Sequence, residues 1–388
     1  MSSSPRFETR AIHAGNDPDK ETGAVSPPIH LASTFEQRTV GENQGFDYSR
    51  AGNPTRKRLE ENISSLENGR FGIAFSSGMA ATTALFQTLD AGDHVIIGHN
   101  VYGGTYRVSM QVLSKHGIEF EFVDTRDLDI LSKSIKSNTR LVFVETPTNP
   151  LLELSDIEAI SQICKLKEVS LAVDNTFMSP YAQNPLSLGS DIVMHSATKF
   201  IGGHSDLLAG ILITNNTRLA ERLYFIQKSV GAVPSPFDCW LMLRSTKTIA
   251  VRVQKQSDNA FEIAKRLIDE IPDCQPIYPG LKTHPQHELA IKQQKSPSGQ
   301  PIFGSILSLR LGSLKKRDKF LSRLKVFTLA ESLGGVESLV CAPYDMTHVA
   351  VPSDTKNSMG LTSDLVRLSV GIENVEDIYE DIIRAFKD

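Results

Sequence analysis

Cysteine is scarce in this chain, and neither cysteine nor histidine is grouped. The four cysteines among 388 residues are far apart, and none forms a CxxC pair; they are Cys164, Cys239, Cys274 and Cys341. The ten histidines show no zinc-ligand spacing, with one another or with these cysteines. The pattern therefore predicts reduced thiols and no metal site.

Long apolar runs and a strong excess of one charge are also missing. No segment reaches the about 18 uncharged residues that a membrane helix needs, and residues 1–5 are followed by charged and polar residues. Charged residues make up 22% of the chain and the net charge is only -4, so no strong field favours nucleic acid or an anionic membrane. We expect a cytoplasmic protein that acts on a small molecule, without nucleic acid or membrane partners.

Length and pattern divide the chain into three parts. A chain of 388 residues is too long for one small core and predicts a large domain with a smaller one. Residues 1–46 lack sustained periodicity and carry many glycines and prolines, so we expect an extended arm that lies on a second subunit. Residues 47–245 are expected to form the large α/β domain. Residues 246–388 are expected to form a smaller α+β domain of amphipathic helices and strands.

Strand and helix signals alternate from Phe71 onward, which is typical of an α/β fold. The expected strands are nearly continuous in apolar residues, which predicts a mostly parallel sheet covered on both faces. They lie at residues 71–75, 94–98, 120–124, 140–146, 170–176, 191–198 and 210–215. Such sheets bind ligands beyond the carboxyl ends of their strands. Four segments should meet at that edge: SSGMAA, ETPTNP, DNTF and SATK.

The segment from Ser190 to Asp206 contains a lysine directly after an apolar strand. Thr198 and Lys199 follow the strand, and two glycines then break the chain direction. A lysine at this position in an α/β pattern is placed to form a Schiff base with a carbonyl cofactor. The alternative is a solvated surface lysine, and the segment alone leaves both interpretations open.

Two other strand-end segments have both a structural and a ligand-binding interpretation. Ser76, Ser77 and Gly78 lead straight into a helix, whose free N–H groups suit a phosphate unless a serine simply caps the helix. The segment lacks the lysine of a Walker loop and the spacing of a dinucleotide fingerprint. Asp174 ends a buried strand and is either a loop or capping aspartate or the partner of a protonated pyridine nitrogen.

Two arginines also have two interpretations each. Arg50 lies in a loop just before a helix and is either a surface residue or a phosphate clamp. Arg367 lies in the expected strand LVRLSVG, where its side chain faces opposite to those of Val366 and Leu368. It is either a charge at the rim of the sheet or a bidentate receptor for a carboxylate.

The ordered set of motifs resembles the Cys/Met metabolism family of pyridoxal-phosphate enzymes over nearly the whole chain. The motifs are AIHAG, YSRAGNPT, SSGMAA, YGGTY, ETPTNP, VDNTF, SATKF with GHSD, GAVPSPFDCW, AESLGGVESL, MTH and VRLSVG. The resemblance implies an aspartate aminotransferase-like fold (PLP-dependent transferase fold type I) and pyridoxal 5'-phosphate (PLP) as cofactor. It also implies a homotetramer, a dimer of dimers with active sites shared between subunits.

The resemblance assigns the cofactor site residue by residue. It implies that Lys199 carries PLP, that Asp174 keeps the pyridine nitrogen protonated, and that Tyr102 stacks on the ring and acts as a catalytic acid or base. The phosphate is expected to be held partly by one subunit and partly by its neighbour. The groups of the first subunit are the backbone amides of Gly78 and Met79 and the hydroxyls of Ser196 and Thr198. The neighbour is expected to supply Tyr48 and Arg50.

The resemblance also assigns the substrate site. It implies that Arg367 binds the α-carboxylate of an amino acid with help from Asn149 and Ser332. Glu331 is expected to attract the distal amino group of the substrate, and Asp47 adds a second carboxylate toward the same end.

The resemblance implies a carbon–sulfur lyase of transsulfuration, in cysteine and methionine metabolism. The expected reaction is γ-elimination on L-cystathionine, giving cysteine, 2-oxobutanoate and ammonia. The alternative is γ-replacement of an O-acyl-homoserine with cysteine, because both reactions use the same catalytic set. Gly104 replaces the cysteine of methionine γ-lyases and disfavours that activity, and the segment around Glu331 differs from that of cystathionine β-lyases. Cys341 departs from the acidic residue of animal γ-lyases and leaves the fine specificity open.

Overall fold

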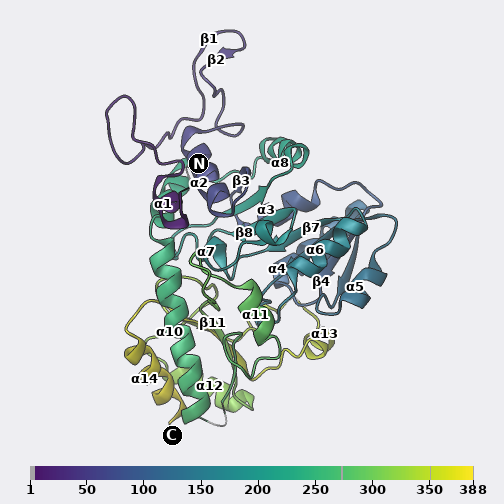
Figure 1. Cartoon of the computed structure of the whole chain (residues 1–388), viewed down its shortest axis with the longest axis vertical. Helices are drawn as coiled ribbons and strands as arrows, with labels where there is room; N and C mark the ends of the chain where they lie inside the picture. The colour runs from purple at the N-terminus through teal and green to yellow at the C-terminus, as the bar shows by residue number, and fades with distance from the viewer. Residues whose placement is uncertain (1–4, 272–273, 350, 388) are drawn as a thin grey trace.

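The structure is a computed structural model that describes residues 5–271, 274–349 and 351–387. The first four residues of the predicted arm lie outside the described residues. So do residues 272–273, 350 and 388 of the predicted smaller domain. Two sheets follow one another along the long axis of the molecule, and the long helix α10 (Ile249–Glu270) runs beside them (Figure 1).

The larger sheet has seven strands in the order β3-β9-β8-β7-β6-β4-β5. Its strands are β3 (Phe71–Phe75), β4 (His94–Gly98), β5 (Glu119–Val123), β6 (Thr139–Glu145), β7 (Ser170–Asp174), β8 (Ile192–Ser196) and β9 (Gly210–Thr214). β9 is antiparallel to its neighbours β3 and β8, and the pairs from β8 through to β5 are parallel. The prediction of a mostly parallel sheet is confirmed.

Successive residues of these strands pack on opposite faces of the larger sheet. Ile192 and Met194 of β8 belong to one apolar cluster, whereas Val193 between them belongs to a cluster on the other side. In β7, Ala172 faces the first side and Val173 the second. Both faces are therefore buried, which explains the nearly continuous apolar runs in the sequence.

Helices cover both faces of the larger sheet. The face of Met194 packs against α3 (Gly78–Phe86), α4 (Gly103–Gln111) and α8 (Thr217–Val230). The opposite face packs against α2 (Pro54–Leu66), α5 (Leu128–Ser134), α6 (Ile157–Leu166), α7 (Ser179–Ala182) and α9 (Pro236–Thr246). Side-chain caps fix where several of these helices begin, for example Asn53 at α2 and Asp156 at α6. Two short 3₁₀ turns, η1 (Leu113–His116) and η2 (Pro185–Leu188), complete this part.

The second sheet has the order β10-β11-β14-β13-β12. Its strands are β10 (Gln275–Ile277), β11 (Ile306–Arg310), β12 (Thr328–Leu329), β13 (Leu339–Cys341) and β14 (Leu365–Ser369), and nearby helices are α11 (His287–Gln293), α12 (Leu314–Arg323), α13 (Ser353–Ser358) and α14 (Val375–Phe386). Val366 and Leu368 of β14 pack into a core with the second half of α10. Ile249 and Val253, in the first half of α10, belong to the core of the larger sheet. A single helix thus connects both cores, and the expected smaller α+β part is confirmed.

The amino-terminal segment differs in one place from the extended arm that we expected. Residues Phe7–His13 form a helix, α1, and Phe7 and Ala11 are buried in the core beside Leu59 and Ile63 of α2. Two apolar residues one turn apart suffice to bury a short helix but are too few to give a visible period. Farther along, the hairpin of β1 (Gln37–Thr39) and β2 (Glu42–Asn43) is exposed and projects from the body (Figure 1).

Three further properties of the described residues bear on function. No helix among them is both long and apolar enough to span a bilayer. Within the same residues, no group of three or more His, Cys, Asp or Glu side chains is arranged to hold a metal ion. The four cysteines are buried and unpaired.

Candidate active site

A cavity of about 340 Å³ lies at the carboxyl edge of the larger sheet, where residues of the second sheet close it. Small-molecule and cofactor sites commonly occupy about 300–1,000 Å³ at this edge of α/β sheets. The four segments predicted to meet at this edge all contribute to its lining. The sequence-predicted residues that line it are Gly78, Met79, Tyr102, Asn149, Asp174, Ser196, Thr198, Lys199, Glu331, Ser332 and Arg367.

Lys199 is a partly buried residue in the turn after β8. Its Nζ donates a hydrogen bond to the hydroxyl of Ser332, 2.8 Å away, which comes from the other sheet's side of the cavity. Burial lowers the pKa of Lys199 to about 8, and the positive charge of Arg367 adds to this, while Glu331 and Cys341 oppose it. Loss of solvation disfavours the charged amine. The site therefore holds a lysine that is uncharged at a lower pH than a surface lysine.

The start of α3 packs closely against Ser196 and lines the same cavity as Lys199. Ser77 caps the helix by accepting a hydrogen bond from the amide of Ala80, and this cap leaves the amides of Gly78 and Met79 free for a ligand. A Cβ on Gly78 would lie 2.8 Å from Cβ of Ser196, so only glycine fits this approach. The amides of Gly78 and Met79 stand in the first turn, where N–H groups have no intrahelical partner. They line the cavity and make it suited to an anion.

Asp174 is a buried carboxylate at the end of β7. Its Oδ1 accepts hydrogen bonds from the amide of Thr176 at 3.0 Å and from the hydroxyl of Thr176 at 2.5 Å. Burial raises the pKa of Asp174, and the two bonds from Thr176 oppose this rise. Thr176 Oγ1 in turn accepts from the amide of Ser196 at 2.9 Å, which ties the ends of β7 and β8 together. A cationic ligand next to Asp174 would restore the charge balance.

Glu145 is a second buried carboxylate, and the sequence analysis missed it. It ends β6 in register with Asp174 of β7. Its Oε2 accepts from the amide of Tyr102 at 2.8 Å and its Oε1 from the amide of Asn149 at 3.0 Å. Burial and the nearby Asp174 raise its pKa well above the ordinary value. The available signal was its position as the last residue of the apolar run LVFVE, equivalent to that of Asp174 in SLAVD.

Arg367 is almost fully buried in the middle of β14, with 2% of its surface exposed. Its Nη1 donates to Oδ1 of Asn149 at 2.8 Å and its Nη2 to the carbonyl of Ser332 at 2.7 Å. Its Nε is buried without a hydrogen-bond partner among the described residues. Val366 and Leu368 face the apolar core instead, as the strand alternation predicted. This arginine lines the cavity and is no rim charge.

Asp47, Tyr48 and Arg50 are not brought to this cavity within one chain. Arg50 stacks over the ring of Tyr48, with 5.4 Å between the guanidinium carbon and the ring centroid. Its Nη1 also donates to the carbonyl of Lys228 at the end of α8. Tyr48 is about half exposed. A contribution of these three residues to the active site of a second subunit stays a prediction.

Tyr102 stands at the mouth of the cavity just before α4, with its ring next to Gly104. A Cβ on Gly104 would lie 2.4 Å from a ring carbon of Tyr102 and 2.8 Å from the sulfur of Met79. A larger residue at this position would displace the ring or the thioether. Gly104 therefore fixes the room available to Tyr102.

These features together fit PLP. An amine of low pKa can attack the carbonyl carbon of the cofactor. The helix start at Gly78 can bind its phosphate, and buried Asp174 can pair with its protonated ring nitrogen. Glycine at position 78 allows the start of α3 to approach Ser196, which also lines the cavity. The fold and the site define a PLP-dependent enzyme of fold type I.

Comparison with known proteins identifies the family. The sequence model of the "Cys/Met metabolism PLP-dependent enzyme" family matches residues 8–387, and the chain belongs to this family. It is 47% identical to the cystathionine gamma-lyase of Bacillus subtilis over 98% of this chain and 99% of that protein. It is 46% identical to a cystathionine beta-lyase of Lactococcus lactis, again over 98% and 99% of the two chains.

Solved structures agree with this assignment. The structure of cystathionine gamma-lyase from Lactobacillus plantarum, complexed with L-serine, superposes with a TM-score of 0.94. It is 42% identical, and the match covers 98% of each chain. The aspartate aminotransferase-like fold and PLP as the cofactor, both implied by the sequence motifs, are confirmed.

Proposed function

We propose that this protein is a carbon–sulfur lyase that catalyses γ-elimination on L-cystathionine. With one water, the substrate is converted to cysteine, 2-oxobutanoate and ammonia. The observation that carries the proposal is the arrangement of Lys199, Ser332 and Arg367 around one cavity, with Glu331 also in its lining. It offers a reactive amine, a carboxylate receptor and a negative group for a second ammonium. Relatives named cystathionine gamma-lyase support the same substrate.

Arg367 and Lys199 have different roles in the proposed reaction: the first binds the substrate and the second transfers protons. PLP, when bound, supplies an electron sink that lowers the cost of removing protons next to the reacting amino group. Arg367 and Asn149 hold the α-carboxylate and thereby fix which face of the substrate Cα is presented to Lys199. Nζ of Lys199, with its lowered pKa, accepts the Cα proton and later returns a proton.

Three other residues act on the cofactor, the leaving group and the distal end of the substrate. Asp174 would pair with the protonated ring nitrogen of the cofactor, and this cation would balance the buried charge of the carboxylate. Tyr102 lines the cavity, where its ring would hold the cofactor in place and its hydroxyl would donate a proton to the departing sulfur. Glu331 attracts the distal ammonium of cystathionine and so selects a diamino acid.

β-Elimination on the same substrate is a second candidate, because relatives in Lactococcus lactis bear the name cystathionine beta-lyase. The two reactions break different carbon–sulfur bonds. γ-Elimination yields 2-oxobutanoate and cysteine, whereas β-elimination yields pyruvate and homocysteine. Product analysis after incubation of the PLP-loaded enzyme with L-cystathionine separates them. We expect 2-oxobutanoate to predominate; predominant pyruvate would reject the proposal.

γ-Replacement requires its own assay. The enzyme is incubated with an O-acyl-homoserine and cysteine, and cystathionine is measured. We expect this rate to be lower than that of cystathionine cleavage. A faster synthesis than cleavage would assign the alternative reaction to this chain.

We also propose that the chain assembles into a homotetramer, a dimer of dimers with shared active sites, in the cytoplasm. The exposed hairpin β1–β2 and the stacked pair of Tyr48 and Arg50, both outside the cavity of their own chain, support the sharing. Mixing inactive Arg50→Ala and Lys199→Ala proteins tests it. If subunits complete one another's sites, exchange creates some intact sites and activity returns. No recovery after verified subunit exchange would contradict it.

A further inference from the structure

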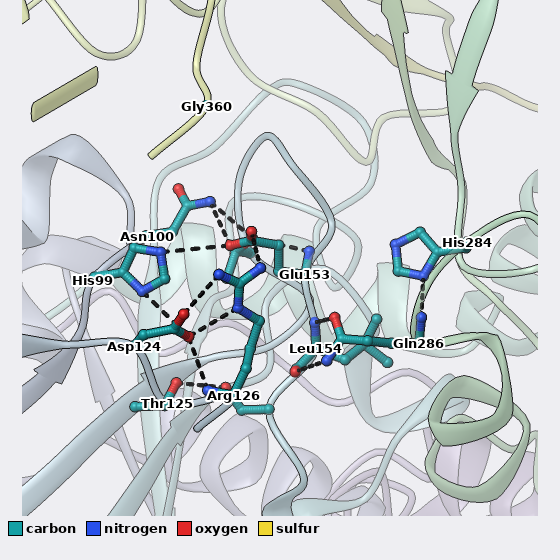
Figure 2. A network of polar contacts seen from close by, with 12 residues as sticks. His99, Asn100, Asp124, Thr125, Arg126, Glu153, Leu154, His284, Gln286 and Gly360 are labelled. Atoms are coloured by element: carbon teal, nitrogen blue, oxygen red, sulfur yellow. Dashed lines mark hydrogen bonds and ion pairs between the residues drawn. The ribbon is translucent and has the colours of Figure 1, made fainter. Parts of the chain in front are cut away.

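Two loops carry side chains of the candidate site, and both follow neighbouring strands of the larger sheet. Residues 99–102 follow β4 and end at Tyr102; residues 146–154 follow β6 and contain Asn149. Glu145 joins the two loops at their inner ends, because it accepts from the amides of both Tyr102 and Asn149. A second glutamate, Glu153, joins them at their outer ends (Figure 2).

The contact between the loops runs through Asn100 and Glu153. Nδ2 of Asn100 donates to Oε2 of Glu153 at 3.0 Å and to Oγ1 of Thr148 at 3.3 Å. The second loop is closed on itself, since the amide of Thr148 donates to the carbonyl of Glu153 at 2.9 Å. Asn100 is buried, with 1% of its surface exposed. The side-chain amide of Asn100 therefore binds both Thr148 and Glu153, the two ends of the turn that contains Asn149.

An ion-pair cluster fixes the carboxylate of Glu153 from the outer side. Arg126 makes a fork with Asp124, with Nε–Oδ1 at 2.8 Å and Nη2–Oδ2 at 2.7 Å, and its Nη1 donates to Oε1 of Glu153. His99 lies between the two carboxylates, 3.7 Å from Asp124 and 3.8 Å from Glu153. Figure 2 shows the guanidinium lying between both carboxylates. The segments after β5 and β6 thus meet at Arg126, and His99 after β4 contacts the same two carboxylates.

The same loop is held on its other side by the carboxyl-terminal part of the chain. Gln286 pairs its side-chain amide with the backbone of Leu154: the amide of Leu154 donates to Oε1 at 2.7 Å, and Nε2 donates to the carbonyl of Leu154. Gln286 is in turn held by His284, whose Nδ1 accepts from the amide of Gln286 at 3.2 Å (Figure 2). The loop that contains Asn149 is therefore held from two sides: Arg126 binds Glu153, and Gln286 binds Leu154.

Arg126 and Asp124 are partly exposed, whereas the side chain of Glu153 is only 16% exposed. The side chain of Arg126 is 40% exposed and that of Asp124 is 35% exposed. Ion pairs at such positions contribute little to unfolding stability because water screens them. Their fork geometry still specifies position, since a guanidinium binds a carboxylate in a fixed plane.

We propose that the pair of Arg126 and Glu153 is a positioning device that sets the separation between Tyr102 and Asn149. Neither residue lines the cavity. Their action passes through Asn100 to the first loop and through the closed turn to Asn149, which bonds the carboxylate receptor Arg367. The inference rests on one part of the proposed function, namely that the site binds an amino acid through its α-carboxylate.

The test compares variants of the PLP-loaded enzyme by their affinity for glycine, read from the absorbance change of the bound cofactor. Arg126→Gln and Glu153→Gln should each weaken glycine binding about tenfold, a size typical of indirect coupling, and Arg126→Lys should lie between Arg126→Gln and the parent. Arg140→Gln is the matched control, because Arg140 pairs with Asp93 at 3.4 Å with a 52% exposed side chain on the same sheet. This control should bind glycine like the parent.

Hydrogen exchange provides a readout that does not depend on ligand or activity. Peptides covering residues 99–102 and 146–154 should exchange faster in Arg126→Gln than in Arg140→Gln, while thermal midpoints of both proteins stay close to that of the parent. The double variant Arg126→Gln/Glu153→Gln should differ little from either single variant, because both substitutions remove the same ion pair between Arg126 and Glu153. Unchanged glycine affinity and unchanged exchange in the two single variants would overturn the inference. A parent enzyme that binds glycine but does not cleave cystathionine would reject the proposed function and leave this inference standing.

Discussion

The amine of Lys199 donates a hydrogen bond to the hydroxyl of Ser332 across 2.8 Å, and this bond connects the sides of the cavity that come from the two sheets. Ser332 has a φ of 95°, an uncommon backbone conformation for a residue other than glycine. In this conformation its carbonyl accepts from Nη2 of Arg367 at 2.7 Å. One residue therefore contacts both the amine and the carboxylate receptor.

Ser332→Ala should slow turnover while leaving the cofactor attached. The change removes the acceptor for Nζ of Lys199 but keeps the backbone carbonyl that holds Arg367. Loss of one hydrogen bond of about 1 kcal/mol corresponds to roughly a fivefold lower kcat. Steady-state kinetics with L-cystathionine measure it, with the exposed Ser322→Ala in α12 as control. An unchanged kcat in Ser332→Ala would show that the hydroxyl does not orient the amine.

The pH dependence of Lys199 should separate it from other lysines. Its pKa is lowered to about 8, chiefly by burial, whereas an ordinary lysine titrates near about 10.4. In cofactor-free protein, labelling of Lys199 by an amine reagent should therefore rise through a midpoint near pH 8. Because the folded pKa lies below the unfolded one, the folded chain binds fewer protons, and this group makes unfolding stability rise with pH between about 8 and 10.4. Mass spectrometry of labelled peptides gives the midpoint; a value near that of exposed lysines would contradict the burial argument.

Arg367→Lys should raise KM far more than it lowers kcat. A lysine retains the charge but loses the planar fork that reaches both Asn149 and Ser332. Loss of the paired hydrogen bonds to a buried carboxylate costs about 2 kcal/mol or more of binding, so a rise in KM of at least about 30-fold is expected. Arg310→Lys on the neighbouring strand β11 is the control, because Arg310 bonds Thr362 and Gly360 outside the cavity. Equal effects of both substitutions on KM would remove Arg367 from the substrate site.

Glu331→Gln should affect substrates according to whether they carry a second ammonium. Glu331 lines the cavity, and its charge also acts on Lys199. For cystathionine we expect KM to rise about tenfold, the size of a single charge contact near a surface. A cystathionine analogue that lacks the distal amino group should show little change. A parallel rise for both compounds would mean that Glu331 acts on the amine of Lys199 rather than on the substrate.

Much of the larger sheet could be predicted from its apolar runs. β6 to β9 are buried on both faces, so each strand is a short unbroken run that ends at a polar residue. The short helix α1 was missed because its burial rests on Phe7 and Ala11 alone, with the rest of its surface facing solvent or polar partners. Tertiary contact with α2 decides its structure, and a period cannot reveal that.

The site residues that lie at strand ends could be found from the sequence because the topology brings such ends together. Lys199, Asp174 and the start of α3 at Gly78 are of this kind. Arg367 could be placed on the correct face of its strand, but its partner Asn149 is 218 residues away in the chain. The cluster of Arg126 and Glu153 could not be predicted, because ion pairs between loops leave no periodic signal and depend on the packing of three strand ends.

Borohydride reduction of the PLP-loaded enzyme shows which lysine carries the cofactor. Reduction fixes the cofactor to the amine that carries it, and digestion followed by mass spectrometry locates the modified lysine. We expect the added mass on Lys199, and we expect Lys199→Ala to carry no such mass and to turn over cystathionine at least about 1,000-fold more slowly. Cofactor fixed to another lysine of the parent enzyme, or turnover retained in Lys199→Ala, would contradict this assignment.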